Sequence, residues 1–211
     1  MTVKTTKEKI LDAALKLFNR DGLVNVRLQH IADEAFVSVG NLAYHYANKE
    51  AILSALYESL TEQQDALLAE YRIVPLFDNI DRLIRYTYQL QRAFVFFYLD
   101  TLEIIRAYPP IGDTHRQRIR SQISQLKNML NFNVARGALA TETVAGTYDQ
   151  LARQLWMTMD QWLYQQAVNG EKFDDEAAYQ QAVWNLLIPC FTPMGIKEYQ
   201  QMLEHPYDFY F

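Results

Sequence analysis

Residues 31–50 read IADEAFVSVGNLAYHYANKE, and this stretch predicts two short helices joined by a tight turn. The first helix covers about 27–35, and its inward-facing residues are Leu28, Ile31, Ala32 and Ala35. The second covers about 39–45, and the hydroxyl of Ser38 is a good N-cap for it. Residues 36–38 form the connection. A turn this short between two short helices is the plan of a helix-turn-helix.

Further helices are predicted on both sides of this pair. Before it, apolar residues at helical spacing predict an amphipathic helix over 5–20 that ends at Gly22. After it, Asn48 is expected to cap a long helix that runs from Lys49 to about Tyr71. Helices predicted in the rest of the chain lie at about 78–92, 94–107, 113–136, 145–169, 175–191 and 195–204.

The composition agrees with a mostly helical protein. Half of the 211 residues are hydrophobic, whereas glycine and proline together number 13, which is few for a protein of many short strands. We therefore predict an all-α fold with two domains. Residues 1–48 form a three-helix helix-turn-helix domain, and residues 49–211 form a larger helical domain.

Charge and aromatic residues are unevenly distributed between these two parts. Residues 1–50 have a net charge of +1 and four aromatic residues, whereas residues 51–211 have a net charge of −6 and 24 aromatic residues. The longest apolar run, at 93–99, is far shorter than the roughly 20 residues that span a bilayer. A single cysteine, Cys190, fits a reducing compartment. We expect a cytoplasmic protein with no membrane partner.

The pattern of reactive side chains does not indicate catalysis. The four histidines are scattered, and no two of them have the i, i+4 spacing of a helical metal site. There is no glycine-rich phosphate loop and no serine nucleophile elbow. We expect no enzyme activity, no metal and no cofactor.

Three motifs follow one another in an order that resembles a known family. They are KEKILDAALKLF at 7–18, IADEAFVSVGNL at 31–42 and YHYANKEAIL at 44–53. Residues 6–56 resemble the DNA-binding domain of TetR-family transcriptional regulators. This resemblance implies a homodimer that binds a palindromic double-stranded DNA operator, most often as a repressor that a small molecule releases. It assigns DNA binding to residues 1–48 and ligand binding and dimerisation to residues 49–211, and the matching motifs cover about a quarter of the chain.

The predicted third helix has one face that suits a major groove. Leu42 and Tyr46 share a side and can anchor the helix to the core, so Gly40, Asn41 and Tyr44 face away or to the flank. An Asn side chain can pair with a base edge, and a small residue lets the backbone approach closely. The candidate DNA-binding residues are Lys4, Lys7, Arg27, Val39, Gly40, Asn41, Ala43, Tyr44, His45 and Lys49.

Roles within this set follow from side-chain chemistry. Ala43 can meet a thymine methyl group, and Tyr44, His45 and Lys49 suit phosphate oxygens. The alternatives are an ordinary surface aromatic for Tyr44 and a neutral capping residue for His45. Solvated charges are the alternative for the basic residues near the N-terminus.

The helix-turn-helix domain at residues 1–48, here called the head, departs from the family pattern at several positions. Phe36 stands where the family usually has glycine, and Ala43 stands where tyrosine is common. Arg27 replaces a capping Ser or Thr, so Asn25 is a candidate cap for the second helix. Val39 replaces a basic or polar residue. These changes make the operator sequence unreadable by analogy.

Aromatic and methionine side chains on the central helices are candidates for an effector pocket, because regulators of this family enclose one there. Ordinary core packing is the alternative for each. The candidates are Phe94, Phe97, Tyr98, Leu102, Met129, Phe132, Trp156, Met159, Asp160 and Leu163. We expect an apolar or aromatic effector. Asp160 could receive its cation or donor, or could pair with Arg136 or Arg153.

The resemblance also implies dimerisation through the last long helices, at about 145–169 and 175–191. Candidate interface residues are Trp162, Tyr179, Val183, Trp184, Leu186 and Leu187. Two other functions remain open. The chain could be a regulator or activator that needs no ligand, or a helical small-molecule-binding protein or enzyme that has lost DNA binding.

Overall fold

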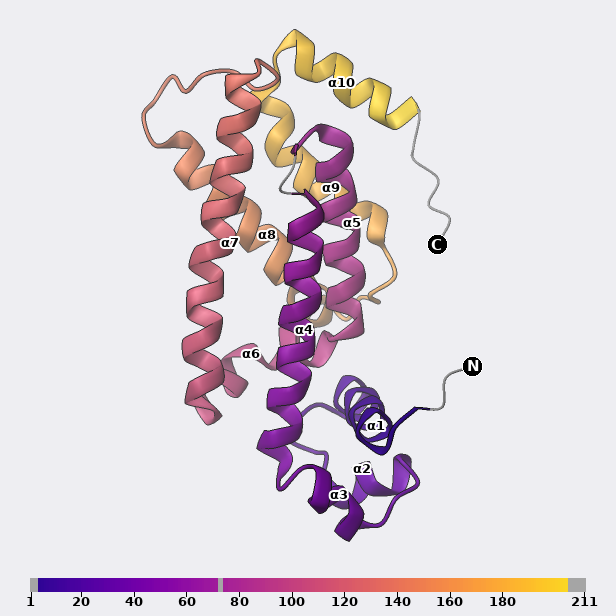
Figure 1. The fold of residues 1–211 in the computed structure, drawn as a ribbon. Coiled ribbons are helices and arrows are strands. Elements are labelled where there is room, and N and C mark those ends of the chain that lie inside the picture. The colour runs from indigo at the N-terminus through magenta and orange to yellow at the C-terminus, as the bar shows by residue number, and fades with distance from the viewer. Residues whose placement is uncertain (1–3, 72–73, 205–211) are drawn as a thin grey trace. The chain divides into compact units, whose positions relative to one another are not determined.

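The computed structural model describes residues 4–71 and 74–204, and these residues form ten α-helices and one short 3-10 helix (Figure 1). The helices are α1 (Thr6–Asp21), α2 (Leu28–Glu34), α3 (Val39–His45), α4 (Lys49–Tyr71), α5 (Phe77–Ala93), α6 (Val95–Ala107), α7 (Pro109–Ala135), α8 (Thr147–Asn169), α9 (Glu176–Leu187), η1 (Ile188–Cys190) and α10 (Pro193–Glu204). The predicted all-α class, with a helix-turn-helix first and a larger helical part after it, is confirmed.

Capping side chains begin three of the early helices, and two of them, Ser38 and Asn48, are caps that the sequence predicts. The hydroxyl of Thr5 accepts a hydrogen bond from the N–H of Glu8 at 3.3 Å, and the Glu8 carboxylate accepts one from the Thr5 N–H at 2.6 Å. Ser38 Oγ accepts the N–H of Asn41 at 3.1 Å and so starts α3. Asn48 Oδ1 accepts the N–H of Ala51 at 2.8 Å and starts α4.

The start of α7 differs most from the prediction. The helix begins at Pro109, whereas its predicted start lies near residue 113. Proline is tolerated in the first turn of a helix because the N–H groups there have no partner inside the helix. Pro109 and Pro110 therefore open α7 rather than precede it.

Packing divides the chain into two compact units. The first contains residues up to Gln64 together with Ala93–His115, so α6 belongs to the same unit as the helix-turn-helix. Its core includes Phe18, Leu42 and Phe97, each at most 2% exposed. The second unit contains Asp65–Arg92 and the chain from Arg116 onward. Its largest fully buried side chains are Tyr88, Tyr179 and Trp184, along with Phe77.

A buried carboxylate ties α5 to α9 inside the second unit. Asp81 is 8% exposed, and it accepts hydrogen bonds from Trp184 Nε1 at 2.8 Å and from Arg85 Nε at 2.9 Å. Gln180 Nε2 also donates to it. Because each oxygen has a donor, the charge can be buried at this helix contact without an unpaired oxygen.

Candidate DNA-binding surface and effector-binding residues

The third helix presents the face that the sequence predicts. α2 packs against both α1 and α3 (Figure 1), and Leu42 of α3 is fully buried. The side chains of Asn41 and Ala43 are exposed, and that of Tyr44 is 85% exposed. Gly40 is exposed as well, and the nearest atom to a methyl group placed there would be Ser38 Oγ at 4.0 Å. This face is open to a partner as broad as DNA.

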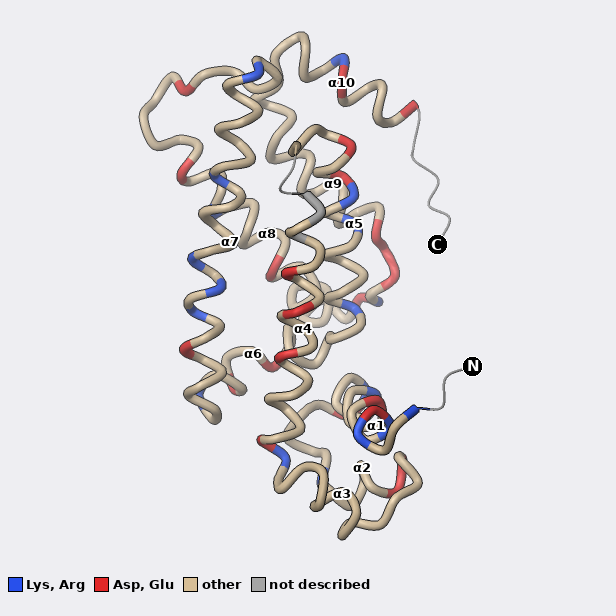
Figure 2. Tube along the Cα trace, in the orientation of Figure 1, with Lys and Arg blue, Asp and Glu red and all other residues tan. Residues whose placement is uncertain are grey.

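The exposed face of α3 carries no acidic residue, lysine or arginine. The tube over Val39–His45 is tan throughout in Figure 2, because this helix contains no Lys, Arg, Asp or Glu. A neutral face can read bases through amide hydrogen bonds and apolar contacts, while attraction to phosphate must come from its flanks. Val39, at the start of this face, is 37% exposed.

The end of α3 brings two aromatic side chains together. The rings of Tyr44 and His45 meet edge to face, with 5.2 Å between their centroids. His45 is half-buried, whereas the Tyr44 hydroxyl end is free to reach outward. Tyr46, predicted as an anchor, is half-buried, and burial raises the pKa of its phenol. Of these three residues, only Tyr44 is exposed.

The basic candidates lie in different environments. Lys7 and Arg27 are exposed. Lys4 Nζ lies 2.6 Å from Asp12 Oδ2, and this hydrogen bond raises the pKa of Lys4. Arg27 is itself the N-cap residue of α2, and its N–H donates to Nδ1 of His30 at 3.3 Å. Asn25 is the predicted candidate cap of α2, but it does not cap this helix. Its amide donates instead to the carbonyl of Asp21 at 2.8 Å.

Lys49 points into the first unit. Its ammonium donates to the backbone carbonyl of Leu23 and lies 5.7 Å from the centre of the Phe18 ring. Burial lowers the pKa of Lys49. A contact between this ammonium and a phosphate would require it to leave the Leu23 carbonyl. The side chain therefore ties the start of α4 to the loop between α1 and α2, a role that the sequence does not reveal.

The ten pocket candidates are divided between the two units. Phe94, Phe97, Tyr98 and Leu102 belong to the first unit, and the six from α7 and α8 belong to the second. The members that are buried are Phe94, Phe97, Tyr98 and Leu163, and those that are half-buried are Met129, Trp156, Met159 and Asp160. Leu102 and Phe132 are 56% and 37% exposed. Side chains this exposed do not line an enclosed cavity within a single chain.

Asp160 is the ionisable member of the set. Its Oδ2 accepts a hydrogen bond from Gln161 Nε2 at 2.7 Å, and desolvation raises its pKa to about 6. Arg136, one of the two cations predicted to pair with it, instead forms an ion pair with Glu198. Arg153, the other, is exposed. Asp160 thus remains a partly buried acid whose charged form is disfavoured.

Sequence reasoning missed a row of buried polar groups beside these candidates. Gln91 Nε2 donates to the carbonyl of Met159 at 2.9 Å and so joins α5 to α8. The polar atoms Tyr88 Oη, Gln91 Oε1, Trp162 Nε1 and Gln166 Oε1 are buried without a hydrogen-bond partner in the described part of the chain. Such groups are costly unless something binds them. Their sequence signal is weak, because a glutamine on an apolar face is easily passed over.

The candidate interface residues are mostly covered within one chain. Tyr179, Val183, Trp184 and Leu187 are at most 2% exposed, and Trp162 and Leu186 are half-buried. Large apolar side chains on α8 that are exposed instead are Met157, Tyr164 and Val168, at 57%, 47% and 63%. Their spacing of seven and four residues places them on one face of the helix.

Two further properties concern the described residues alone. No group of three or more His, Cys, Asp or Glu side chains in them could hold a metal ion. None of their helices combines the length and the apolar composition needed to cross a membrane.

A helix-turn-helix with an open, uncharged recognition helix, followed by a larger helical domain, defines a DNA-binding transcriptional regulator. Family comparison makes this specific. The model described as "Bacterial regulatory proteins, tetR family" matches residues 10–56, and the TetR model described as "Bacterial transcriptional repressor" matches residues 57–199. The chain belongs to the TetR family of transcriptional regulators.

One sequence relative is a transcriptional regulator, and two solved structures share the fold. The HTH-type transcriptional regulator RutR of Escherichia coli O157:H7 is 27% identical over 191 residues, which cover 87% of this chain and 88% of RutR. The solved structure of a TetR-family regulator from Marinobacter aquaeolei VT8 has a TM-score of 0.83 at 19% identity, over 96% of this chain and 99% of that one. A gamma-butyrolactone receptor has a TM-score of 0.66 at 18% identity, over 93% and 97%.

Proposed function

We propose that this regulator is a homodimeric repressor that binds a palindromic operator in the bacterial cytoplasm and leaves it when a small molecule binds the larger domain. The exposed, uncharged face of α3 carries the DNA-binding part of the proposal. Asn41 is exposed on that face and has a carboxamide that can bond a base edge, while its backbone N–H is already used by Ser38. Tyr44 suits the sugar-phosphate backbone.

The DNA-binding test compares two substitutions on an operator selected from random duplexes. Asn41→Ala should reduce discrimination at one base pair by about 1–3 kcal/mol and leave the affinity for unrelated DNA nearly unchanged. Tyr44→Ala should weaken binding to all sequences by a similar factor. Asn25→Ala is the matched control, because its amide bonds the Asp21 carbonyl within the head. An unchanged preferred sequence in Asn41→Ala would contradict the base-reading role.

A dimer is supported by the exposed apolar face of α8. Met157, Tyr164 and Val168 would bury apolar area against the same face of a second copy, as an isologous interface requires. Tyr164→Asp should shift the protein toward monomer in sedimentation at micromolar concentration and weaken operator binding. Leu203→Asp, on an exposed residue of α10, is the control for adding one charge. A dimer of unchanged stability in Tyr164→Asp would locate the interface elsewhere.

Effector binding is supported by the aromatic and polar groups of the larger domain. Tyr88, Gln91, Trp162 and Gln166 offer unused donors and acceptors, and Asp160 adds an acid close in sequence to Trp162. We infer an effector with an aromatic body and a few hydrogen-bonding groups, one of which is a donor or cation for Asp160.

A compound screen for operator release tests this step. Asp160→Asn should leave the affinity for the operator unchanged. It should alter the concentration of a releasing compound that is needed to remove the protein from the operator. The exposed Asp174→Asn is the control. If no compound ever weakens operator binding, the regulator that needs no ligand is the better account. If no DNA binds at all, the chain is a helical protein that has lost this function.

A further inference from the structure

The first turn of α6 is capped by a side chain from α1. The residue before α6, Phe94, makes no capping hydrogen bond with its side chain. Instead, Asn19 Oδ1 accepts the N–H of Phe96 at 3.1 Å, and Asn19 Nδ2 donates to the carbonyl of Ala93 at 2.8 Å. The Asn19 carboxamide therefore bonds both the Phe96 N–H and the Ala93 carbonyl at the start of α6. It acts as an N-cap although it belongs to another helix.

A second contact joins α6 to the loop between α1 and α2. Asp100 Oδ2 accepts the N–H of Leu23 at 3.2 Å. The carbonyl of the same Leu23 accepts from the ammonium of Lys49 at the start of α4. The rings of Phe18 on α1 and Phe96 on α6 also pack against each other, with 5.3 Å between their centroids. The backbone of Leu23 is thus bonded to a side chain of α6 through its N–H and to a side chain of α4 through its carbonyl.

We propose that Asn19 and Asp100, here called the α6 clamp, transmit the state of α6 to the DNA-binding helices. The inference rests on the proposed function and adds a direct route to the head beside the long helix α4. Both residues are positioning residues, because they act through α6 and not on DNA or effector.

The placement of the clamp on α6 supports this coupling. Phe97 and Tyr98, two of the buried pocket candidates, lie in the same turn as Phe96, whose N–H is held by Asn19. An α-helix moves as a rigid body over one turn because its backbone hydrogen bonds run from residue i to i−4. Any shift of α6 that moves these two rings therefore also strains or breaks the bonds to Asn19 and Asp100.

DNA itself can serve as the probe, because coupling between two sites is reciprocal. If the clamp couples α6 to the head, a change in the conformation of α6 alters the affinity for the operator. Operator binding must then alter the local unfolding of α6 in return. Amide hydrogen exchange of the dimer, measured with and without a selected operator duplex, reports this. In the wild type we expect exchange over residues 101–107 to differ about fivefold or more between the free and bound states.

Three variants test whether the clamp carries this effect. Asn19→Ala and Asp100→Ala should each abolish the operator-dependent difference over 101–107, which lies beyond the first turn that a lost cap would fray. Asp100→Asn keeps an oxygen acceptor for the Leu23 N–H and should retain the difference. Asn25→Ala, an asparagine of the same loop region with no α6 partner, should retain it too.

The outcomes separate this inference from the proposed function. A wild-type dimer that binds no operator would overturn the proposed function. Operator binding that leaves exchange over 101–107 unchanged would overturn the clamp alone, as would a difference that survives in both alanine variants. If Asn19→Ala does not fold, the contrast between Asp100→Ala and Asp100→Asn decides.

Discussion

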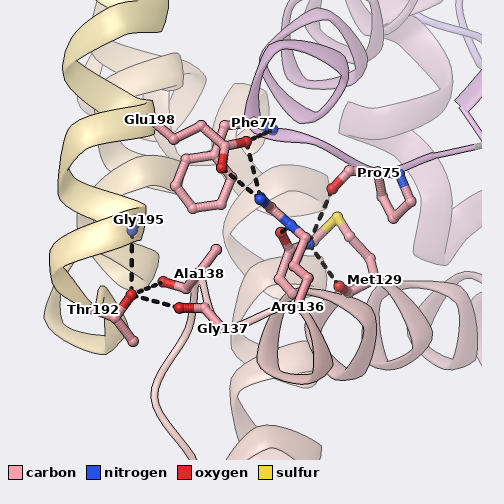
Figure 3. Close-up of polar contacts among 10 residues, drawn as sticks. Pro75, Phe77, Met129, Arg136, Gly137, Ala138, Thr192, Gly195 and Glu198 are labelled. Carbon is pink, nitrogen blue, oxygen red and sulfur yellow. Dashed lines mark hydrogen bonds and ion pairs between the residues drawn. The ribbon is translucent and has the colours of Figure 1, made fainter.

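The carboxylate of Glu198 and the guanidinium of Arg136 meet in two hydrogen bonds, Nη1 to Oε2 at 2.5 Å and Nη2 to Oε1 at 2.9 Å (Figure 3). The side chains of Arg136 and Glu198 are only 15% and 21% exposed. Glu198 Oε1 also accepts the backbone N–H of Phe77 at 3.0 Å, and the guanidinium lies 5.3 Å from the centre of the Phe77 ring. One acidic residue thus joins α10, the end of α7 and the start of α5.

Glu198→Ala should therefore lower the free energy of unfolding by about 3 kcal/mol, because it leaves a mostly buried guanidinium without its partner. The measurement is urea denaturation at a fixed protein concentration, so that any contribution of self-association to the free energy of unfolding is the same for each variant. The double variant Arg136→Met with Glu198→Leu should lose less than Glu198→Ala alone. Glu204→Ala, at an exposed position on α10, is the control. A loss below 1 kcal/mol in Glu198→Ala would mean that water replaces the pair.

Gly195→Ala should destabilise the same region by about 2 kcal/mol or more. A methyl group at Gly195 would overlap the backbone carbonyl of Ala138 and touch Cβ of Phe191. The backbone has little room to yield, because the Gly195 N–H donates to Thr192 Oγ1 at 3.2 Å, which in turn donates to the Gly137 carbonyl at 2.6 Å (Figure 3).

The matched control for Gly195→Ala is Gly40→Ala. That position lies in α3, and apart from its chain neighbours and the helix backbone the nearest atom to the added methyl group is Ser38 Oγ at 4.0 Å. Helix propensity should therefore make the change neutral or stabilising by up to about 1 kcal/mol. Thermal unfolding of both variants distinguishes the two cases. Equal midpoints would contradict the close approach of α10 to Ala138.

The helices were predictable because the hydrogen bonds and residue preferences that determine where a helix starts and ends are local in sequence. Ser38 and Asn48 each bond an N–H three residues ahead, so their capping role can be inferred from the sequence alone. The start of α7 was misplaced because Pro109 is compatible both with a helix start and with a break. The cap of α6 was beyond such reasoning, because Asn19 and Ala93 are 74 residues apart in the chain.

The residues of the candidate site show the same difference between local features, which the sequence predicts, and contacts between distant residues, which it does not. The exposed face of α3 follows from helix geometry once Leu42 is assigned to the core, and that assignment is confirmed. The direction of Lys49 depends on the Leu23 carbonyl, which comes from a different loop. For Tyr179 and Trp184, periodicity indicates burial but cannot tell whether the same chain or a second copy covers them.

Phe36→Gly should stabilise the protein by about 0.5–1 kcal/mol. Phe36 adopts φ of +57°, a left-handed conformation that costs a non-glycine residue roughly 1–2 kcal/mol, and its side chain is 94% exposed, so little packing is lost. Part of the gain is offset by the greater freedom of glycine in the unfolded chain. Phe36→Ala removes the ring but keeps the strain, so it should change the unfolding midpoint little. A lower midpoint in Phe36→Gly would show that the ring is packed.

Asp160→Asn should stabilise the protein at neutral pH and not at low pH. Desolvation raises the pKa of Asp160 from its usual 3.8 to about 6, so folding favours the protonated acid. Below pH 3.8 both the folded and the unfolded chain hold the proton, and the acid costs nothing. As pH rises toward 6, the unfolded chain ionises first, so the wild type loses stability that it does not regain above pH 6.

The expected advantage of Asp160→Asn is therefore about 2–3 kcal/mol at pH 7.5, and it should shrink steadily below pH 6. Urea denaturation of both proteins at pH 4.5, 6.0 and 7.5 measures this difference. Asp174→Asn, at an exposed position before α9, reports what the loss of one surface charge does by itself. An advantage of equal size at pH 4.5 and 7.5 would contradict a desolvated acid. A loss of stability at pH 7.5 would instead identify Asp160 as one half of a structural ion pair.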